Sequence, residues 1–177
     1  MEINYRSIHE NEIDRELFRN FIRHQTVDIC LRREDDAWVE RSAPFIDDWG
    51  EAEYEILIQC LRNTTASGGL VYGAFVSGKL KGFVSVEPGI FGEDNRYMDL
   101  SSIHVSEDMR GRGIGKVLFS SAKDWAREHG AKKLYISSHS AIESQRFYEA
   151  MGCEDAAACD QRHVEAEPYD RQLECKL

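Results

Sequence analysis

Residues 110–116, Arg-Gly-Arg-Gly-Ile-Gly-Lys, place three glycines and three cations close together in a chain whose formal net charge is -10. Glycine has no Cβ, so Gly111, Gly113 and Gly115 let backbone N–H groups approach a ligand that larger side chains would keep away. An apolar run with helical spacing follows. The first turn of such a helix has unpaired N–H groups and carries the positive end of the helix dipole. The pattern therefore predicts an anion site, most simply for phosphate.

Two familiar phosphate-binding motifs do not fit this stretch. A P-loop would need a glycine at position 110 and a Ser or Thr at position 117, where the chain has Arg110 and Val117. The dinucleotide pattern Gly-x-Gly-x-x-Gly would need a third glycine at position 116 or 118, where the chain has Lys116 and Leu118. The stretch instead matches Arg/Gln-x-x-Gly-x-Gly/Ala, with Arg110 as its first residue.

This hexapeptide resembles the loop with which the GNAT superfamily of N-acetyltransferases binds the pyrophosphate of acetyl-coenzyme A. Two further motifs follow the order of that family: DLSSIHV at 99–105 before the loop, and AIESQRFYEAMG at 141–152 after the strand-like KKLYISSHS. The resemblance covers about Gly69 to Cys153. It departs at Ala141, where the family often has an asparagine, and Ser140 is the candidate to replace that side chain.

The resemblance implies an α/β (α+β) fold, the GNAT fold, with a central mixed, mostly antiparallel sheet, a splayed parallel strand pair and flanking helices. The residues themselves are informative in the strand before the loop. Leu100 is out of phase with Ile103 and Val105, so either both faces of that strand are buried or a β-bulge resets the alternation. In the family, such a bulge separates two parallel strands and creates the slot for the pantetheine arm.

The segments after the loop have the periodicity of two helices and a strand. The apolar positions of the first helix fall on one stripe, Leu118, Ala122, Trp125 and Ala126. Gly130 is suited to the end of this helix. Leu134 and Ile136 alternate with Lys133 and Tyr135, as in a strand with one buried face. Residues 140–143, Ser-Ala-Ile-Glu, form a capping-box sequence, which predicts a second helix from about Ala141.

The remaining segments give weaker patterns. They predict a strand over 3–8, a helical stripe of Ile13, Leu17 and Phe21 that ends near His24, and a helix that Asp48 and Glu51 cap and that runs to about Asn63. A hairpin is expected to join 68–76 to 79–87, and residues 159–177 can hold two last strands around Glu167-Pro168.

Residues 25–49 lack a clear period, and in the family this region lies over the acceptor site. We therefore expect a loop-rich acceptor-side region at about 25–65 and a cofactor-binding core at about 69–153. Together they would form a single N-acetyltransferase domain over 1–177.

Acetyl transfer from a thioester to an amine needs a polarised carbonyl, a deprotonated amine and a proton for the leaving thiolate. Tyr148 occupies the tyrosine of the family's Phe-Tyr motif and is the candidate acid, because a phenol is a proton donor at neutral pH. The alternative is that Tyr148 is a core aromatic residue of a helix. Phe147 is expected to pack in the core.

Three residues are candidates for the base, and an ordered water could replace all of them. Asp99 aligns with an acidic residue of the family's fourth strand, and Glu87 ends the preceding strand. His104 has a side chain that titrates near neutral pH and lies on the strand nearest the thioester. The two carboxylates could equally be solvated strand ends. His139 and His163 are expected to be structural or exposed.

The resemblance also implies contacts with acetyl-coenzyme A, including one through the backbone of His104. They involve the strand before the loop, the loop and the two helices after it: Ile103, His104, Val105, Arg110, Gly111, Arg112, Gly113, Ile114, Gly115, Lys116, Ser140 and Ser144. Acetyl-coenzyme A would be a co-substrate, and no metal is expected.

Composition narrows the class of protein. The chain has 177 residues, of which 42% are apolar, enough for one domain with a core. It shows no run of about 18 apolar residues and no signal-peptide pattern. Its five cysteines include no C-x-x-C pair, which favours a reduced, cytoplasmic protein without a zinc site or a disulfide framework. A pI near 5.1 argues against nucleic-acid binding and weakly favours a cationic acceptor.

Two function classes follow from these observations. The first is an N-acetyltransferase that moves an acetyl group from acetyl-coenzyme A to a small-molecule or peptide amine by direct attack in a ternary complex. The second is a non-catalytic coenzyme A-binding regulatory or sensor module on the same fold. A phosphate-binding hydrolase would need a metal cluster or a nucleophile elbow, and the sequence shows neither. We expect an acyltransferase with no nucleic-acid or membrane partner. The family often forms homodimers, so a homodimer is a possible assembly.

Overall fold

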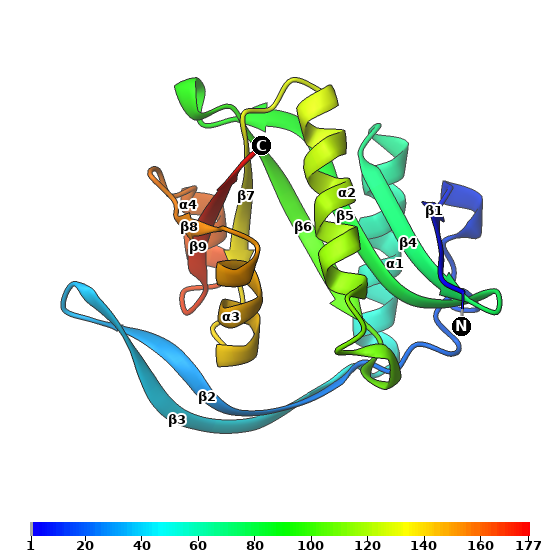
Figure 1. Cartoon of the computed structure of the whole chain (residues 1–177), viewed down its shortest axis with the longest axis horizontal. Coiled ribbons are helices and arrows are strands. Elements are labelled where there is room, and N and C mark those ends of the chain that lie inside the picture. Colours follow the sequence, from blue (N-terminus) through cyan, green and yellow to red (C-terminus); the bar gives the residue numbers. More distant parts are fainter. Residues whose placement is uncertain (1) are drawn as a thin grey trace.

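A mixed sheet of seven strands forms the centre of the computed structural model, which describes residues 2–177 (Figure 1). The strand order is β1-β4-β5-β6-β7-β9-β8. These strands are β1 (Asn4–Ser7), β4 (Leu70–Val76), β5 (Lys79–Phe91), β6 (Tyr97–Val105), β7 (Lys133–Ser138), β8 (Glu154–Asp155) and β9 (Arg171–Lys176). Neighbouring strands are antiparallel except for β6 and β7, which are parallel. The predicted mixed, mostly antiparallel sheet is confirmed.

Helices cover both faces of this sheet. They are α1 (Glu51–Ala66), α2 (Ile114–Glu128), α3 (Ile142–Ala150) and α4 (Gln161–Ala166), with short 3-10 turns η1 (Glu10–Glu12), η2 (Glu93–Asn95) and η3 (Glu107–Met109). In Figure 1, α2 lies in front of the sheet and α1 behind it. Two clusters of buried apolar side chains fill the spaces between the sheet and these helices. Since adjacent residues of a strand point to opposite faces, Leu70 of β4 packs in the cluster on the α2 side and Val71 in the cluster on the α1 side.

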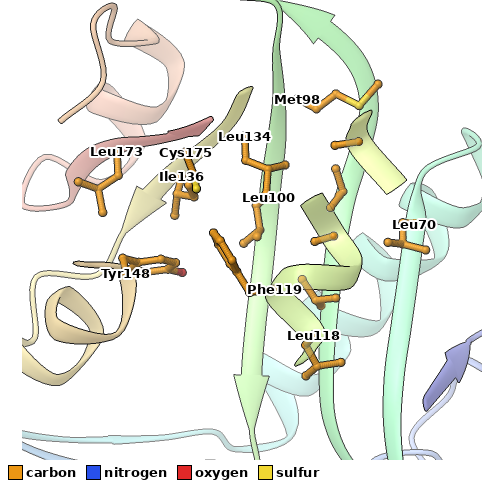
Figure 2. Close-up of a cluster of buried hydrophobic side chains, with 14 of the residues drawn as sticks. Leu70, Met98, Leu100, Leu118, Phe119, Leu134, Ile136, Tyr148, Leu173 and Cys175 are labelled. Atoms are coloured by element: carbon orange, nitrogen blue, oxygen red, sulfur yellow. The ribbon is translucent and has the colours of Figure 1, made fainter. Parts of the chain in front are cut away.

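The larger apolar cluster fixes α2 and α3 to the sheet (Figure 2). Leu118 and Phe119 of α2 pack there with Leu100 of β6, and Tyr148 joins the cluster from α3. The predicted stripe of α2 is therefore its buried face, and Gly130 follows the end of the helix with a φ of +88°.

β6 contains the predicted bulge. Its pairing with β5 shifts register between Ser85–Ser102 and Val86–Leu100, which leaves Ser101 as the extra residue. The pairing of β6 with β7 covers Tyr97–Asp99 and ends there among the described residues. Beyond that point the two parallel strands separate, as expected of a splayed pair.

The expected loop-rich region is instead an ordered hairpin followed by α1. β2 (His24–Glu34) and β3 (Ala37–Asp48) form a separate two-stranded sheet, which extends as a long arm past α3 (Figure 1). The Leu31 N–H donates to the Ser140 carbonyl at 2.8 Å, and Val27 and Cys30 pack against Ala141. Many side chains on both faces of this arm are exposed, so its sequence lacks the alternation of a half-buried strand.

The predicted helix through Ile13, Leu17 and Phe21 is wrong. Residues 15–20 form successive turns, in which N–H groups donate to the carbonyl three residues earlier, as from Phe21 to Phe18 at 2.9 Å. Ile13, Phe18 and Phe21 are all buried under α1 and the sheet. Packing of these apolar side chains, rather than a helical repeat, explains their spacing.

Two predicted helix caps are also wrong. Asp48 ends β3 and contacts His24 Nδ1 at 2.6 Å, whereas α1 begins after Gly50, whose N–H donates to Glu53 at 2.9 Å. Ser140 does not cap α3, because its hydroxyl oxygen accepts a hydrogen bond from Arg32 at 2.8 Å and the N-cap residue is Ala141. Both helices nevertheless begin close to the expected positions.

The end of the chain holds one strand, not two, after the short helix α4. Asp160 caps α4 by accepting the Arg162 N–H at 2.9 Å. β7 is buried on both faces rather than one, because Tyr135 packs between the rings of Phe91 and Tyr97.

All five cysteines are free thiols. No helix within residues 2–177 is long and apolar enough to cross a bilayer.

Candidate functional site

A cavity of about 830 Å³ opens where β6 and β7 separate. Its walls come from β6, the segment 109–116, α3, the end of β7, the base of the hairpin arm and the turn before β9. The volume lies within the range of roughly 300–1,000 Å³ that is typical of small-molecule and cofactor sites. The splayed strands thus create a slot with the glycine-rich segment at one end.

The glycine-rich segment has a backbone that only glycine adopts without strain. Gly111 and Gly113 have φ values of +74° and +79°, and Gly113 is the N-cap of α2. A Cβ on either glycine would meet no heavy atom within 4 Å, so conformation rather than packing requires glycine there. This backbone leads directly into the first turn of α2, whose N–H groups have no partner within the helix.

The cations of this segment differ in position. Arg110 lines the cavity, and its Nε donates to the Val105 carbonyl at 3.2 Å. Burial lowers the pKa of Arg110, and the charge of Arg23 lowers it further. Lys116 is exposed at the start of α2 and also lines the cavity. Arg112 is exposed and is not part of the lining.

The cavity brings together ten of the twelve residues that the sequence assigned to cofactor binding. They are Ile103, His104, Val105, Arg110, Gly111, Gly113, Ile114, Gly115, Lys116 and Ser144. The two residues outside the lining are Arg112 and Ser140, and Ser140 is instead bonded to Arg32 of the hairpin arm. Their contacts with acetyl-coenzyme A stay predictions.

Tyr148 lines the same cavity from α3 and is only 8% exposed. Figure 2 shows its ring extending from α3 toward Leu100 and Phe119, with the phenolic oxygen at the leading end. Burial raises the pKa of Tyr148, and the neighbouring Cys153 and Asp170 raise it further. The hydroxyl therefore keeps its proton at neutral pH. Phe147 also borders the cavity and packs against Phe119.

The two carboxylates predicted as bases do not join Tyr148 in the cavity lining. Glu87 accepts hydrogen bonds from Thr64 at 2.8 Å and Ser101 at 2.7 Å. Asp99 lies 3.0 Å from Nε2 of His163, and its other carboxylate oxygen is buried without a hydrogen-bond partner among residues 2–177. Both carboxylates thus already interact with other side chains.

His104 does line the cavity, but its environment opposes protonation. Burial lowers the pKa of His104 to about 3, with further contributions from the charges of Arg23 and Arg110. Its ring packs between Trp49 and Phe83, with centroid distances of 4.7 and 5.4 Å. A group with so low a pKa is a weak proton acceptor at neutral pH.

The sequence analysis did not assign four charged residues of the cavity wall to the site, and two of them are Arg23 and Asp170. Arg23 lies at the base of the hairpin arm, pairs with Asp47 and stacks over Trp49 at 5.1 Å. Asp170 precedes β9, and its Oδ2 accepts a hydrogen bond from Ser137 at 3.1 Å. Burial raises the pKa of Asp170. Neither residue lies in a periodic pattern, and only the pairing of β7 with β9 brings Asp170 to Ser137.

Comparison with known proteins identifies a family and a fold. The model of the acetyltransferase (GNAT) family matches residues 34–153. Streptothricin acetyltransferase of Streptomyces lavendulae is 39% identical over 59 residues, which cover 33% of this chain and 30% of that protein. The match thus spans less than a third of that relative's length.

Two solved structures resemble the whole chain. The crystal structure of nourseothricin acetyltransferase has a TM-score of 0.70 and 21% identity, and the match covers 98% of this chain and 96% of that one. A putative streptothricin acetyltransferase of Bacillus anthracis, solved in complex with acetyl-coenzyme A, has a TM-score of 0.73 and 15% identity, with coverage of 100% and 99%. At these identities the likeness establishes the fold.

Proposed function

Because the chain belongs to the acetyltransferase (GNAT) family, we propose that it transfers an acetyl group from acetyl-coenzyme A to a primary amine by direct attack in a ternary complex. One observation carries this proposal. The glycine-rich segment and Tyr148 border a single cavity at the point where β6 and β7 separate. An anion cradle and a protonated phenol thus face the same slot, as a phosphate-bearing thioester substrate requires.

The cavity suits acetyl-coenzyme A at its glycine-rich end. The N–H groups of the first turn of α2, together with Arg110 and Lys116, would hold the pyrophosphate. The slot between β6 and β7 would take the pantetheine arm, whose thioester would then lie beside Tyr148. The backbone of β6 in this slot is free of strand pairing on the β7 side, so its polar groups are available to the arm.

Tyr148 would act as the general acid. When the amine attacks the thioester carbonyl, a C–N bond forms and the C–S bond breaks, and the departing sulfur needs a proton. A buried phenol whose pKa is raised above its ordinary value carries that proton throughout the neutral range. Direct transfer needs no covalent enzyme intermediate, so it assigns no nucleophilic role to any cysteine.

For the acceptor we propose a cationic amine, with streptothricin-type antibiotics as the first candidates. The support is the matched segment of the Streptomyces lavendulae enzyme, together with two carboxylates of the cavity wall, Glu167 and Asp170, in the turn before β9. The cavity also contains Arg23, but Asp47 neutralises this cation. A positively charged acceptor is thus electrostatically matched to this part of the cavity wall.

The test is an acceptor screen with isotopically labelled acetyl-coenzyme A and mass-spectrometric detection. The panel contains streptothricin, polyamines, aminoglycosides and lysine-bearing peptides, and each acceptor is also incubated without enzyme and with Tyr148→Phe. We expect enzyme-dependent incorporation of the label into streptothricin. Binding of acetyl-coenzyme A without acetylation of any amine would instead favour a coenzyme A sensor on the same fold.

A further inference from the structure

A chain of hydrogen bonds runs through β7 and β9 and ends on a carboxylate of the cavity wall. The Asp160 N–H donates to the Tyr135 hydroxyl at 2.9 Å, which donates to Gln172 Oε1 at 2.5 Å. Gln172 Nε2 donates to the Ser137 hydroxyl at 3.0 Å, and Ser137 donates to Asp170 Oδ2 at 3.1 Å. Every bond in the chain points toward Asp170.

This direction of donation is fixed by chemistry. The Ser137 oxygen accepts from the amide of Gln172, so its single hydrogen is free to reach the carboxylate, which can only accept when ionised. Tyr135 is 0% exposed and Gln172 is 8% exposed, so the chain lies in the interior. It therefore holds Asp170 in one orientation through Oδ2 and favours its ionised form.

Other proton acceptors of the cavity wall are less suited to take a proton. His139 Nδ1 accepts the Ala141 N–H at 3.1 Å, so the neutral ring carries its hydrogen on Nε2 and has no free lone pair. His104 packs between the rings of Trp49 and Phe83, and its lowered pKa makes it a weak proton acceptor. Glu143 and Glu167 are exposed side chains, whereas Asp170 is partly buried.

We propose that Asp170 is the base that deprotonates the acceptor's ammonium group, an assignment that rests on the proposed acetyl transfer. Asp170 and Tyr148 line the same cavity from the turn before β9 and from α3. The carboxylate attracts the positively charged acceptor and receives its proton on Oδ1. The acceptor class is therefore a primary alkylammonium rather than a neutral arylamine.

The protons of this reaction balance. Asp170 takes one proton from the ammonium, and the free amine forms a C–N bond with the thioester carbonyl carbon as the C–S bond breaks. Tyr148 gives its hydroxyl proton to the departing sulfur and recovers one from the nitrogen, which loses a second proton as the amide forms. Asp170 later releases its proton to solvent. Each turnover thus converts an ammonium and a thioester into an amide, a thiol and one proton.

The groups around Asp170 set its strength as a base. Burial raises the pKa of Asp170 and the charge of Glu167 raises it further, whereas the Ser137 hydrogen bond, and His139 and His163 when they are protonated, lower it. A raised pKa makes the carboxylate a better proton acceptor near neutral pH. Since only the ionised carboxylate can act, the rate should rise with pH through this pKa.

The experiment compares wild type with Asp170→Asn, using acetyl-coenzyme A and streptothricin. Asparagine keeps the shape and can still accept the Ser137 hydrogen bond, but it takes up no proton. We expect kcat at neutral pH to fall about 10²–10⁴-fold, the usual contribution of a general base. As the pH rises toward the alkylammonium pKa of about 10.4, the variant should regain activity in proportion to the unprotonated amine. Acetyl-coenzyme A affinity and thermal stability should match wild type.

Two further variants test whether proton transfer by Asp170, rather than its negative charge alone, explains the expected loss of kcat. Glu167→Gln removes the same charge from the same turn and should lower kcat far less than Asp170→Asn. Ser137→Ala removes the hydrogen bond that favours the ionised carboxylate, so the acidic limb of the kcat/KM profile should move to higher pH.

Three results would overturn the assignment. One is a kcat for Asp170→Asn within about twofold of wild type. Another is a higher KM for the acceptor with an unchanged kcat, which would make Asp170 only a binding group. A third is an equal loss of kcat in Glu167→Gln. If wild type acetylates neither streptothricin nor any other amine of the panel, the proposed function itself fails, and this assignment fails with it.

Discussion

Asp99 Oδ2 lies 3.0 Å from Nε2 of His163, so a carboxylate near the start of β6 is joined to the short helix α4. The His163 ring also stacks on Tyr135 of β7, with a centroid distance of 5.4 Å. The pair therefore helps to hold the last part of the chain against the sheet, next to the turn that carries Asp170. A base role for Asp99 stays a prediction, and in this structure its carboxylate is engaged by His163.

The Asp99–His163 pair should make stability depend on pH. The hydrogen bond that His163 donates to Asp99 raises the pKa of His163, and the Asp99 charge adds to this shift despite the opposing effect of burial. The protonated histidine thus stabilises the fold below its unfolded pKa of about 6.5, and this stabilisation is lost as the pH rises through the folded pKa. His163→Gln should lower the Tm more at mildly acidic pH than at alkaline pH. Thermal unfolding over a pH series measures this, and a pH-independent decrease would contradict it.

Gly113→Ala should weaken acetyl-coenzyme A binding through backbone strain. An alanine at a φ of +79° strains the backbone by about 1–2 kcal/mol. A backbone that relaxed to relieve this strain would turn the N–H groups at the start of α2 away from the ligand. Gly78→Ala is the matched control, because Gly78 has a φ of +77°, equally open surroundings and a position in the β4–β5 turn. Unfolding experiments should show that both variants lose a similar amount of stability. Calorimetric titration with acetyl-coenzyme A should show a reduced affinity only for Gly113→Ala. Equal affinities would mean that this loop is not the pyrophosphate cradle.

Arg110→Ala should lower the affinity for acetyl-coenzyme A by about ten- to a hundredfold, since a charge-assisted hydrogen bond contributes about 1.5–3 kcal/mol. Arg112→Ala should have a smaller effect, because Arg112 belongs to the same loop but does not line the cavity. Arg127→Ala is the control, because Arg127 pairs with Asp124 near the far end of α2. Calorimetry at low salt measures all three, and an Arg110→Ala affinity equal to that of the control would exclude Arg110 from phosphate binding.

The sequence predicts the structure of the expected cofactor-binding core, about residues 69–153, better than that of the expected acceptor-side region, about residues 25–65. The loop, the stripe of α2 and the bulge at Ser101 depend on local spacing, and that spacing is visible in the sequence. The hairpin arm has exposed side chains on both faces and therefore no period to detect. Asp170 was missed for another reason. Its partner Ser137 lies 33 residues earlier, and only sheet topology brings them together.

We propose that acetyl transfer takes place beside the Tyr148 hydroxyl, and the substitution Tyr148→Phe is the most direct test. Phenylalanine keeps the ring packing with Phe119 and removes only the hydroxyl. The measurement is the single-turnover rate of acetylated streptothricin formation at saturating acetyl-coenzyme A, with the Kd for acetyl-coenzyme A determined in parallel. We predict a rate about 10²–10⁴-fold below wild type with an unchanged Kd. A rate within about twofold of wild type would contradict the claim and assign Tyr148 to packing.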